Sequence, residues 1–287
     1  MTKSQATQSQ DGIAGPSSNP MFVDILCAVD GEPGGFVAME QAAALAGPEG
    51  RLTMLLVTSF SAQGEYRSPA IGSAQAKRIL DRAKQIADEA GVPSTVEVDP
   101  ATPPSQVILD WSATRDLLAL GAPTTPRLRG MFNAGVADTA LGSFTTPLLA
   151  ARTTPGDHQF GHRILVASDG RGGSDELVEL GQRLARARGA EMVLLHAAGH
   201  ESHERRERVE EQGRRLGLAA AGTNEVRVER GHAHDVIVGV ADSMGASLVV
   251  MGSRRLDGLR SMGSVSRRVV HEAPCSVLLV PPERLHS

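Results

Sequence analysis

An internal repeat constrains the fold more than any other feature of this sequence. The run ILCAVDG at residues 25–31 returns as ILVASDG at residues 164–170. Each run precedes a helix-like stretch and a second apolar strand: FVAMEQAAALA then RLTMLLV in the first half, ELVELGQRLARA then EMVLLHA in the second. Self-similarity on this scale indicates two copies of one structural unit.

The later elements recur in the same order in both halves. Long polar helices (SAQAKRILDRAKQIADEAG and ESHERRERVEEQGRRLG) are followed by VEVD and VRVE, then SQVILDW and HDVIVGVA, then DLLALG and SLVVMG, and finally FTTPLLAA and APCSVLLVP. Five strands alternating with four helices predict, in each half, a parallel sheet covered by helices on both faces. We therefore expect two doubly wound α/β domains in tandem.

Composition sets the expected domain bounds. Residues 1–20 are rich in Ser, Gln, Gly and Pro and lack an apolar core, which indicates a flexible tail rather than a signal peptide. The first domain is expected at 21–152, a polar linker at 153–161, and the second domain at 162–287. No stretch reaches the apolar length of a membrane span, so we expect a cytoplasmic protein without a membrane partner.

Charge and residue usage exclude several classes of function. A net charge of −4 gives no general attraction to nucleic acid, and aromatic residues at 3% provide no stacking platform for single strands. The last lysine is Lys84, so the second half has no lysine for a Walker-type loop. Cys27 and Cys275 lie inside apolar runs and are predicted to be buried, reduced thiols.

Nothing in the chain predicts a catalytic or metal site. The histidine-containing runs HESH (200–203) and HAHD (232–235) lack a second ligand pair at zinc spacing. His196 closes an apolar strand and is expected to be packed or hydrogen-bonded rather than catalytic. The helix ESHERRERVEEQGRRLG is charged on most faces and is predicted to be solvated. No nucleophile elbow or pair of carboxylates suggests an enzyme, so at most weak ATP hydrolysis is expected.

The stretch GSRRLDGLRSMGSVSRR at 252–268 connects a buried-strand run to a helix-like run. In an open parallel sheet, ligands bind beyond the carboxyl ends of the strands where the strand order reverses. If the second half reverses between its first and fourth strands, Asp169 and Gly252 flank the same crevice, and the helix beginning near Ser264 offers backbone N–H groups to an anion. Two other interpretations stay open: a connection whose glycines serve only geometry, and Asp169 as a turn and helix-capping residue.

The runs ILVASDG, VLLHA and MGSRRLDGLRSMGSVSRRVVHEAPCSVLLVP resemble the universal stress protein family, over about residues 22–152 and 162–282. The resemblance implies an α/β fold of the nucleotide-binding α-hydrolase-like type with strand order 3-2-1-4-5, and ATP binding in some members through G-x2-G-x9-G-[ST]. By this resemblance Asp169 and Ala197 would contact adenine and ribose, and the other nucleotide-binding positions would be Ala167, Gly252, Arg255, Gly263, Ser264, Val265 and Ser266.

The sequence departs from this pattern in both halves. Arg255 occupies the second glycine position, and the interval from Arg255 to Gly263 is two residues short, which removes up to about 7 Å of reach. Arg255 adopts a positive φ less readily than glycine, although its guanidinium can meet a phosphate. In the first half Val136 and Ala137 stand where hydroxyls are needed, and Asp138 adds a negative charge. We expect that half to be degenerate, with Asp30 as a strand-end turn residue.

The last strands suggest how the halves associate. Thr146–Ala151 and Ser276–Val280 end the two domains and are expected to be edge strands, which proteins pair or cover. The resemblance implies a fifth-strand contact, hence a pseudo-dimer within one chain, with a homodimer also open.

Three hypotheses of function follow. The first is a tandem universal stress protein that binds ATP or another adenine nucleotide, with Mg²⁺, in its C-terminal domain as a stress-response regulatory module. The second is a nucleotide-independent dimeric interaction scaffold, and the third is an adenylating or ATP-cleaving enzyme.

Overall fold

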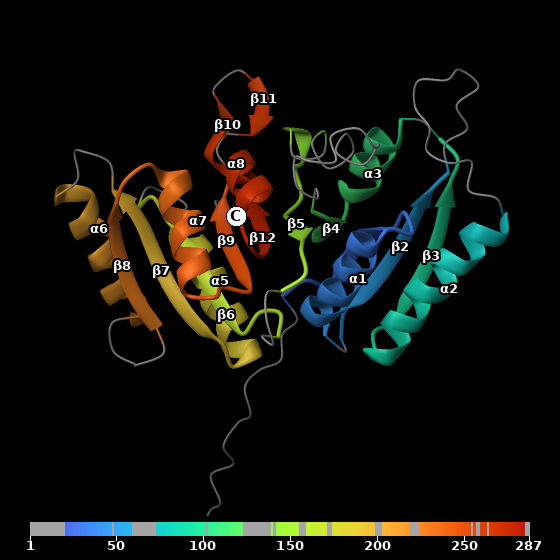
Figure 1. Ribbon diagram of the computed structural model, residues 1–287, viewed down its shortest axis with the longest axis horizontal. Helices are drawn as coiled ribbons and strands as arrows, with labels where there is room; N and C mark the ends of the chain where they lie inside the picture. Colours follow the sequence, from blue (N-terminus) through green and yellow to red (C-terminus); the bar gives the residue numbers. More distant parts are fainter. Residues whose placement is uncertain are drawn as a thin grey trace, which may run out of the picture.

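The computed structural model describes most of both halves (Figure 1). It describes residues 21–47, 49–58, 73–101, 103–122, 139, 142–154, 159–170, 174–198, 203–218, 224–253, 255–256, 259–262 and 264–284. The predicted tail, the middle of the linker, Gly263, and the first-half segment that contains Val136, Ala137 and Asp138 lie outside the described residues.

The described residues of the first half form five strands and three labelled helices, in the predicted alternation. The strands are β1 (Asp24–Ala28), β2 (Arg51–Val57), β3 (Ser94–Asp99), β4 (Leu117–Gly121) and β5 (Leu148–Ala151). The helices are α1 (Pro33–Ala46), α2 (Ser73–Glu89) and α3 (Pro104–Ser112). Residues 139, 142 and 143 are also helical, and the rest of the predicted fourth helix lies outside the described residues.

The second half follows the same plan with one addition. Its strands are β6 (Arg163–Ala167), β7 (Glu191–Ala198), β8 (Asn224–Arg230), β9 (Leu248–Gly252), β10 (Arg255–Leu256), β11 (Leu259–Met262) and β12 (Ser276–Val280). Its helices are α5 (Ser174–Arg188), α6 (His203–Arg215), α7 (Ala233–Ser243) and α8 (Ser264–Glu272), followed by a short 3-10 helix at Pro282–Arg284. The short strands β10 and β11 are the addition, because the sequence analysis did not predict them.

One ten-stranded sheet runs through both halves, in the order β3-β2-β1-β4-β5-β12-β9-β6-β7-β8. Counted within each half, this is the expected order 3-2-1-4-5. The sheets of the two halves are joined, because β5 and β12 pair antiparallel, with Leu149 opposite Leu278. A strand edge has unpaired N–H and C=O groups, and each fifth strand satisfies those of the other. The expected pseudo-dimer within one chain is therefore confirmed.

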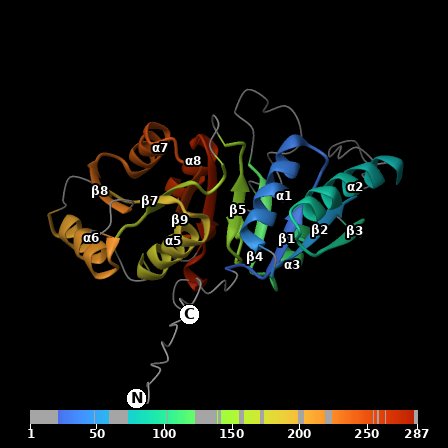
Figure 2. The same ribbon diagram turned by 90° about the horizontal axis from the view of Figure 1, so that it is seen from below.

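Helices cover both faces of the sheet, as Figure 2 shows for the second half, where α5 and α6 lie on one side and α7 and α8 on the other. Alternate residues of the buried strands supply two cores. One core contains side chains of α1, α2, α5 and α6, and the other contains side chains of α3, α7 and α8. The inner strands follow the continuous apolar pattern expected of a sheet buried on both faces, whereas the edge strand β3 is largely exposed.

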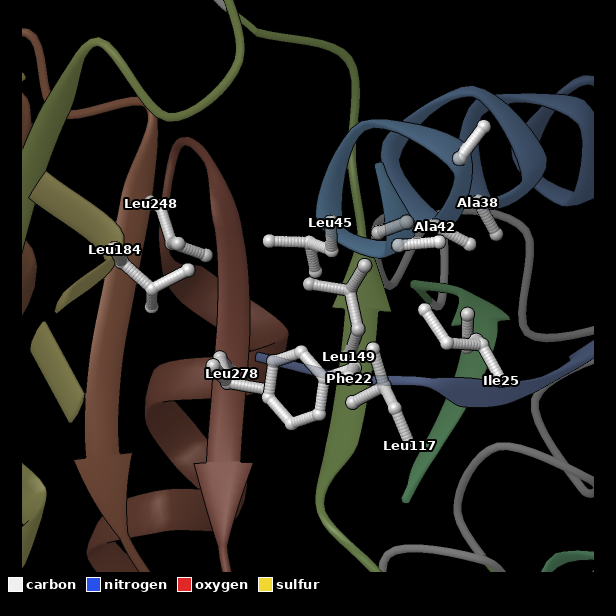
Figure 3. Packing of buried hydrophobic residues seen from close by; sticks show 14 of the residues in the cluster. Phe22, Ile25, Ala38, Ala42, Leu45, Leu117, Leu149, Leu184, Leu248 and Leu278 are labelled. Atoms are coloured by element: carbon white, nitrogen blue, oxygen red, sulfur yellow. The ribbon is translucent and has the colours of Figure 1, made fainter. Parts of the chain in front are cut away.

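The first core continues across the joint between the halves, which we call the seam. Figure 3 shows Phe22, Leu45 and Leu149 of the first half in the same cluster as Leu248 and Leu278 of the second. Leu149, Leu248 and Leu278 are fully buried. Because apolar burial stabilises by about 25 cal/mol per Å², this shared cluster ties the stability of one half to that of the other.

Polar groups also hold the seam together. The amide of Arg152 donates to Ser276 Oγ at 2.9 Å, and Ser276 Oγ donates to Gln41 Oε1 at 2.7 Å. Gln41 Nε2 in turn donates to the Arg152 carbonyl at 2.8 Å. Ser276 and Gln41 are buried, so these hydrogen bonds satisfy groups that water does not reach.

The two cysteines are buried and unpaired, as predicted. Burial raises the pKa of Cys275 to about 12 and raises that of Cys27 as well. Both thiols are therefore protonated in the folded protein. Within the described part of the chain, no helix is both long and apolar enough to cross a membrane.

Candidate functional site

The strand order of the second half reverses between β6 and β9. β7 follows on one side of β6, and β9 lies on the other side with Ala167 opposite Met251. The chain leaves β6 towards α5 on one face of the sheet and leaves β9 towards α8 on the other. This is the arrangement in which doubly wound sheets form a ligand crevice, and it places Asp169 and Gly252 on neighbouring strands at the same end of the sheet.

Asp169 lies in the turn that connects β6 to α5. Its Oδ1 accepts a hydrogen bond from Ser174 Oγ at 3.0 Å, and Ser174 is the first residue of α5. Asp169 is half-buried. The contact agrees with the interpretation of Asp169 as a residue at the start of a helix, and it also fixes where the carboxylate lies.

Helix α8 begins after the carboxyl end of β9, the strand beside β6. Ser264 is its first residue and is exposed, whereas Val265 is half-buried and Ser266 is buried. Ser266 Oγ donates to the Gly252 carbonyl at 3.3 Å. That hydroxyl therefore fastens α8 to the end of β9. The groups that remain to face an anion are the Ser264 hydroxyl and the N–H groups of the first turn, which have no partner within the helix.

The segment between Gly252 and α8 forms a β-hairpin. β10 and β11 pair antiparallel, with Arg255 opposite Met262 and Leu256 opposite Leu259. Figure 1 shows the hairpin projecting beyond α8. The Asp-Gly dipeptide at 257–258 is a sequence signal for a hairpin turn that the sequence analysis did not use. The backbone of Arg255 therefore belongs to the hairpin.

Two small residues end the strands beside Asp169. Ala167 is the last residue of β6, and Ala197 lies near the end of β7; both are half-buried. Leu195 lies opposite Ala167, so Ala197 is two residues further along the neighbouring strand. The structure thus places most of the predicted positions that it describes near the carboxyl ends of β6 and β9, with Ala197 on the neighbouring strand β7.

In the first half the corresponding aspartate, Asp30, has a different hydrogen-bond partner. Asp30 Oδ1 accepts a hydrogen bond from the backbone N–H of Glu32 at 3.0 Å, just before α1 begins at Pro33. This is the local hydrogen bond of an Asx turn. It is what the interpretation of Asp30 as a turn residue predicts.

Sequence reasoning missed a group of buried polar residues on the α5 and α6 face. Helix α6 was predicted to be solvated, but Val209 is fully buried and Gln212 is 3% exposed. Their spacing of three residues was the available signal. Gln212 hydrogen-bonds Ser168 at 3.0 Å, while the expectation of a hydrogen-bonded His196 is confirmed, since its Nδ1 lies 2.9 Å from the Ser168 carbonyl oxygen.

The histidine pattern at 232–235 also finds a structural explanation. His234 is buried, and its Nε2 lies 2.7 Å from Glu272 Oε2, so the imidazole connects α7 to the end of α8. Among the residues that the structure describes, no group of three or more His, Cys, Asp or Glu side chains is arranged to hold a metal ion.

Comparisons with known proteins agree with this architecture. The model of the universal stress protein family matches residues 21–152 and 161–281. A curated protein described as "Universal stress protein in QAH/OAS sulfhydrylase 3'region", from Thermus aquaticus, is 32% identical over 132 residues, which cover 41% of this chain and 96% of that protein.

Two solved structures share the fold along most of the chain. A universal stress protein from Archaeoglobus fulgidus superposes with a TM-score of 0.73 at 20% identity, covering 90% of this chain and 98% of its own. A protein from Pseudomonas aeruginosa superposes with a TM-score of 0.69 at 17% identity, covering 92% and 95%. Since the family model matches both halves, the chain belongs to the universal stress protein family and carries two of its domains in tandem.

Proposed function

We propose that the C-terminal half binds an adenine nucleotide, such as ATP, at the carboxyl ends of β6 and β9, and that the protein acts as a cytoplasmic stress-response regulatory module. One observation supports this most strongly. The Asp169 turn and the first turn of α8 lie on the two sides of the point where the strand order reverses. A carboxylate on one side and helix N–H groups on the other suit a ligand with both hydroxyl and phosphate groups.

Each side of the site has a chemical role in this proposal. The first turn of α8 contains no acidic residue, so the positive end of its dipole is available to a phosphate. The Asp169 carboxylate accepts hydrogen bonds, which suits a ribose hydroxyl or the adenine amino group. Ala167 and Ala197 leave room for the base because their side chains are small. Mg²⁺ would arrive bound to the phosphates and keep several of its waters.

The residues around α8 divide into two groups. Gly252, Arg255, Gly263, Ser264 and Val265 are proposed to contact the phosphates. Ser266 is proposed to act by holding α8 against β9, since its hydroxyl donates to Gly252.

A nucleotide-independent scaffold is the second candidate. The observation that favours it is the hairpin, because the backbone of β10 and β11 pairs with itself instead of remaining open to phosphates. In this alternative both halves would be structural, and the chain would act through its surface.

Calorimetric titration of the full-length protein with Mg²⁺-ATP, ADP and AMP, after a check for co-purified nucleotide, distinguishes the candidates. The proposal predicts one site per chain. Asp169→Ala should weaken binding by at least about tenfold, the equivalent of about 1.4 kcal/mol, and Ser264→Ala should weaken it by a smaller factor. Asp30→Ala is the matched control and should leave the affinity unchanged. An equal loss in Asp30→Ala would contradict the assignment to the C-terminal half, and no binding by the wild type would favour the scaffold.

A further inference from the structure

A buried hydrogen-bond network lies directly beneath the Asp169 turn, and we infer that Gln212 and His196 are positioning residues for this carboxylate. The inference rests on the proposed nucleotide site and deepens it, because it names the residues on helix α6 and strand β7 that fix the geometry of the site.

Every polar group of Ser168, the residue before Asp169, has a hydrogen-bond partner. Its N–H donates to the Leu195 carbonyl at 2.9 Å. Its hydroxyl donates to Gln212 Oε1 at 3.0 Å and accepts from the Gly170 N–H at 3.1 Å. Its carbonyl oxygen lies 2.9 Å from His196 Nδ1. The backbone on either side of Asp169 therefore has little freedom to move.

Gln212 connects this turn to the start of the next helix. Its Nε2 donates to Asp175 Oδ1 at 2.6 Å, and Asp175 Oδ2 accepts from Arg215 at 2.6 Å. Asp175 lies in the first turn of α5, next to the Ser174 hydroxyl that donates to Asp169. One side chain of α6 thus fixes both ends of the segment that carries Asp169. Because Gln212 and Ser168 are buried, water replaces neither bond readily when it is lost.

The contact of His196 defines its tautomer. A carbonyl oxygen only accepts, so Nδ1 carries the hydrogen of this bond and donates it. Nε2 is buried and has no hydrogen-bond partner among the described residues. An apolar side chain would fill this position without leaving such an atom, so the histidine is there for its Nδ1–H bond to the turn.

The first half shows that the fold itself does not need these polar groups. The N–H of Val29 donates to the Leu55 carbonyl at 2.9 Å, as the N–H of Ser168 does to that of Leu195, so Val29 and Ser168 are equivalent positions. By the same register Leu56 is equivalent to His196. Val29 and Leu56 are buried in the apolar core. The same strand-to-turn connection forms on apolar residues in the first half, where Asp30 Oδ1 accepts from the Glu32 N–H of the turn.

Because the equivalent positions of the first half are apolar, we assign the hydrogen-bond network around Ser168 to the proposed nucleotide site. Buried polar groups that are fully bonded specify one geometry more strictly than apolar packing does. In the second half that geometry is the placement of the Asp169 carboxylate relative to α8.

The test compares Gln212→Leu with Gln182→Leu. Gln182 is also a buried glutamine of the same region, and its Nε2 donates to the Leu216 carbonyl at 2.7 Å, but it does not contact the turn. Gln212→Leu removes the two hydrogen bonds from α6 to Ser168 and Asp175, and Gln182→Leu removes one from α5 to the residue after α6. We expect ATP affinity to fall about five- to tenfold in Gln212→Leu and less than about twofold in Gln182→Leu.

Two readouts in the ligand-free protein make the test independent of nucleotide binding. Hydrogen exchange of the Gly170 amide should accelerate about fivefold or more in Gln212→Leu and stay unchanged in Gln182→Leu. The nitrogen NMR spectrum of the His196 ring should show the Nδ1–H tautomer in the wild type.

The outcomes separate this inference from the proposed function. Equal loss of affinity in both variants would mean general loosening of α5 and α6 and would overturn it. If the wild type binds no nucleotide, the proposed function fails. Unchanged Gly170 exchange in Gln212→Leu would overturn the positioning role by itself, whatever the nucleotide result.

Discussion

The two halves share a backbone plan and differ in the residues beneath their equivalent aspartates. Val29 and Leu56 lie near the ends of β1 and β2 beside Asp30, whereas Ser168 and His196 occupy the equivalent positions beside Asp169. The first pair adds to the apolar core, and the second pair builds a hydrogen-bonded turn. The fold forms with apolar residues at these positions, as the first half shows. Polar residues there are therefore not needed for the fold, and we connect them with the candidate site.

The two halves are not independent of each other in stability. They share a sheet and a core across β5 and β12. A substitution at the seam should therefore affect both halves, and one beneath Asp169 should affect the site alone. The predictions below test this division, starting with the largest effect.

Leu278→Ala should destabilise the protein by about 3 kcal/mol, because it removes a fully buried side chain from the shared core. The loss should appear in both halves. Thiol labelling of Cys27 in the first half and of Cys275 in the second should accelerate by the same factor, since each thiol becomes reactive only on opening. Faster labelling of Cys275 alone would mean that the halves unfold separately.

Ser276→Ala should cost about 1 to 3 kcal/mol, because it leaves buried partners of the seam without a hydrogen bond. Ser247→Ala is the matched control, since Ser247 Oγ accepts from the Arg163 N–H and donates to the Arg163 carbonyl within the second half. Both variants should lower the midpoint of chemical unfolding. Only Ser276→Ala should increase hydrogen exchange in β5 of the first half, and equal exchange in the two variants would contradict a special role of the seam.

The triple variant Ser168→Val, His196→Leu, Gln212→Leu should make the second half resemble the first. The substitutions remove the side chains that bond the Gly170 N–H, the backbone carbonyl at position 168 and Asp175 Oδ1, so the free energy of unfolding should fall by about 1 to 3 kcal/mol. Nucleotide affinity should fall about fivefold or more. Calorimetry and denaturant unfolding check both parts, and a large loss of stability with unchanged affinity would reverse our assignment.

The smallest effect concerns a charge pair that is inverted between the halves. Asp24 faces Arg51 across β1 and β2, and Arg163 faces Glu191 across β6 and β7. Burial tends to raise the pKa of the Asp24 carboxyl, but hydrogen bonds from Arg51 and Arg115, both at 2.7 Å, outweigh it and lower the pKa.

A lowered native pKa contributes stability above the unfolded value of about 3.9, and this contribution is lost as the pH falls through the native pKa. Asp24→Asn should therefore lower stability at pH 7 by up to about 1 kcal/mol, and the difference from the wild type should vanish in acid. The control Glu191→Gln removes an exposed pair at 3.2 Å and should change stability by less than about 0.5 kcal/mol. Urea unfolding across pH checks both, and a difference for Asp24→Asn that persists in acid would contradict the mechanism.

The repeat predicted the order of elements along the chain, because that order depends on local periodicity and on punctuation by Gly and Pro. The strand order within each half was implied by the resemblance to the family. The repeat also predicted that the fifth strands would need partners. The hairpin at β10 and β11 was missed because the segment was compared with a phosphate loop, although Asp257 and Gly258 favour a tight turn. The role of Gln212 was not predictable in the same way. The hydrogen-bond partners of one glutamine in a charged helix are set only by the packing of α6 against the turn after β6.

The antiparallel pairing of β5 and β12 also has a genetic consequence. In a dimer of identical subunits, one substitution in the gene appears on both sides of the interface and in both binding sites. Here each side is encoded separately, so a change in one half leaves the sequence of the other intact. Selection can therefore change one half without changing the residues of the other, and one half can serve as a permanent, covalently attached partner.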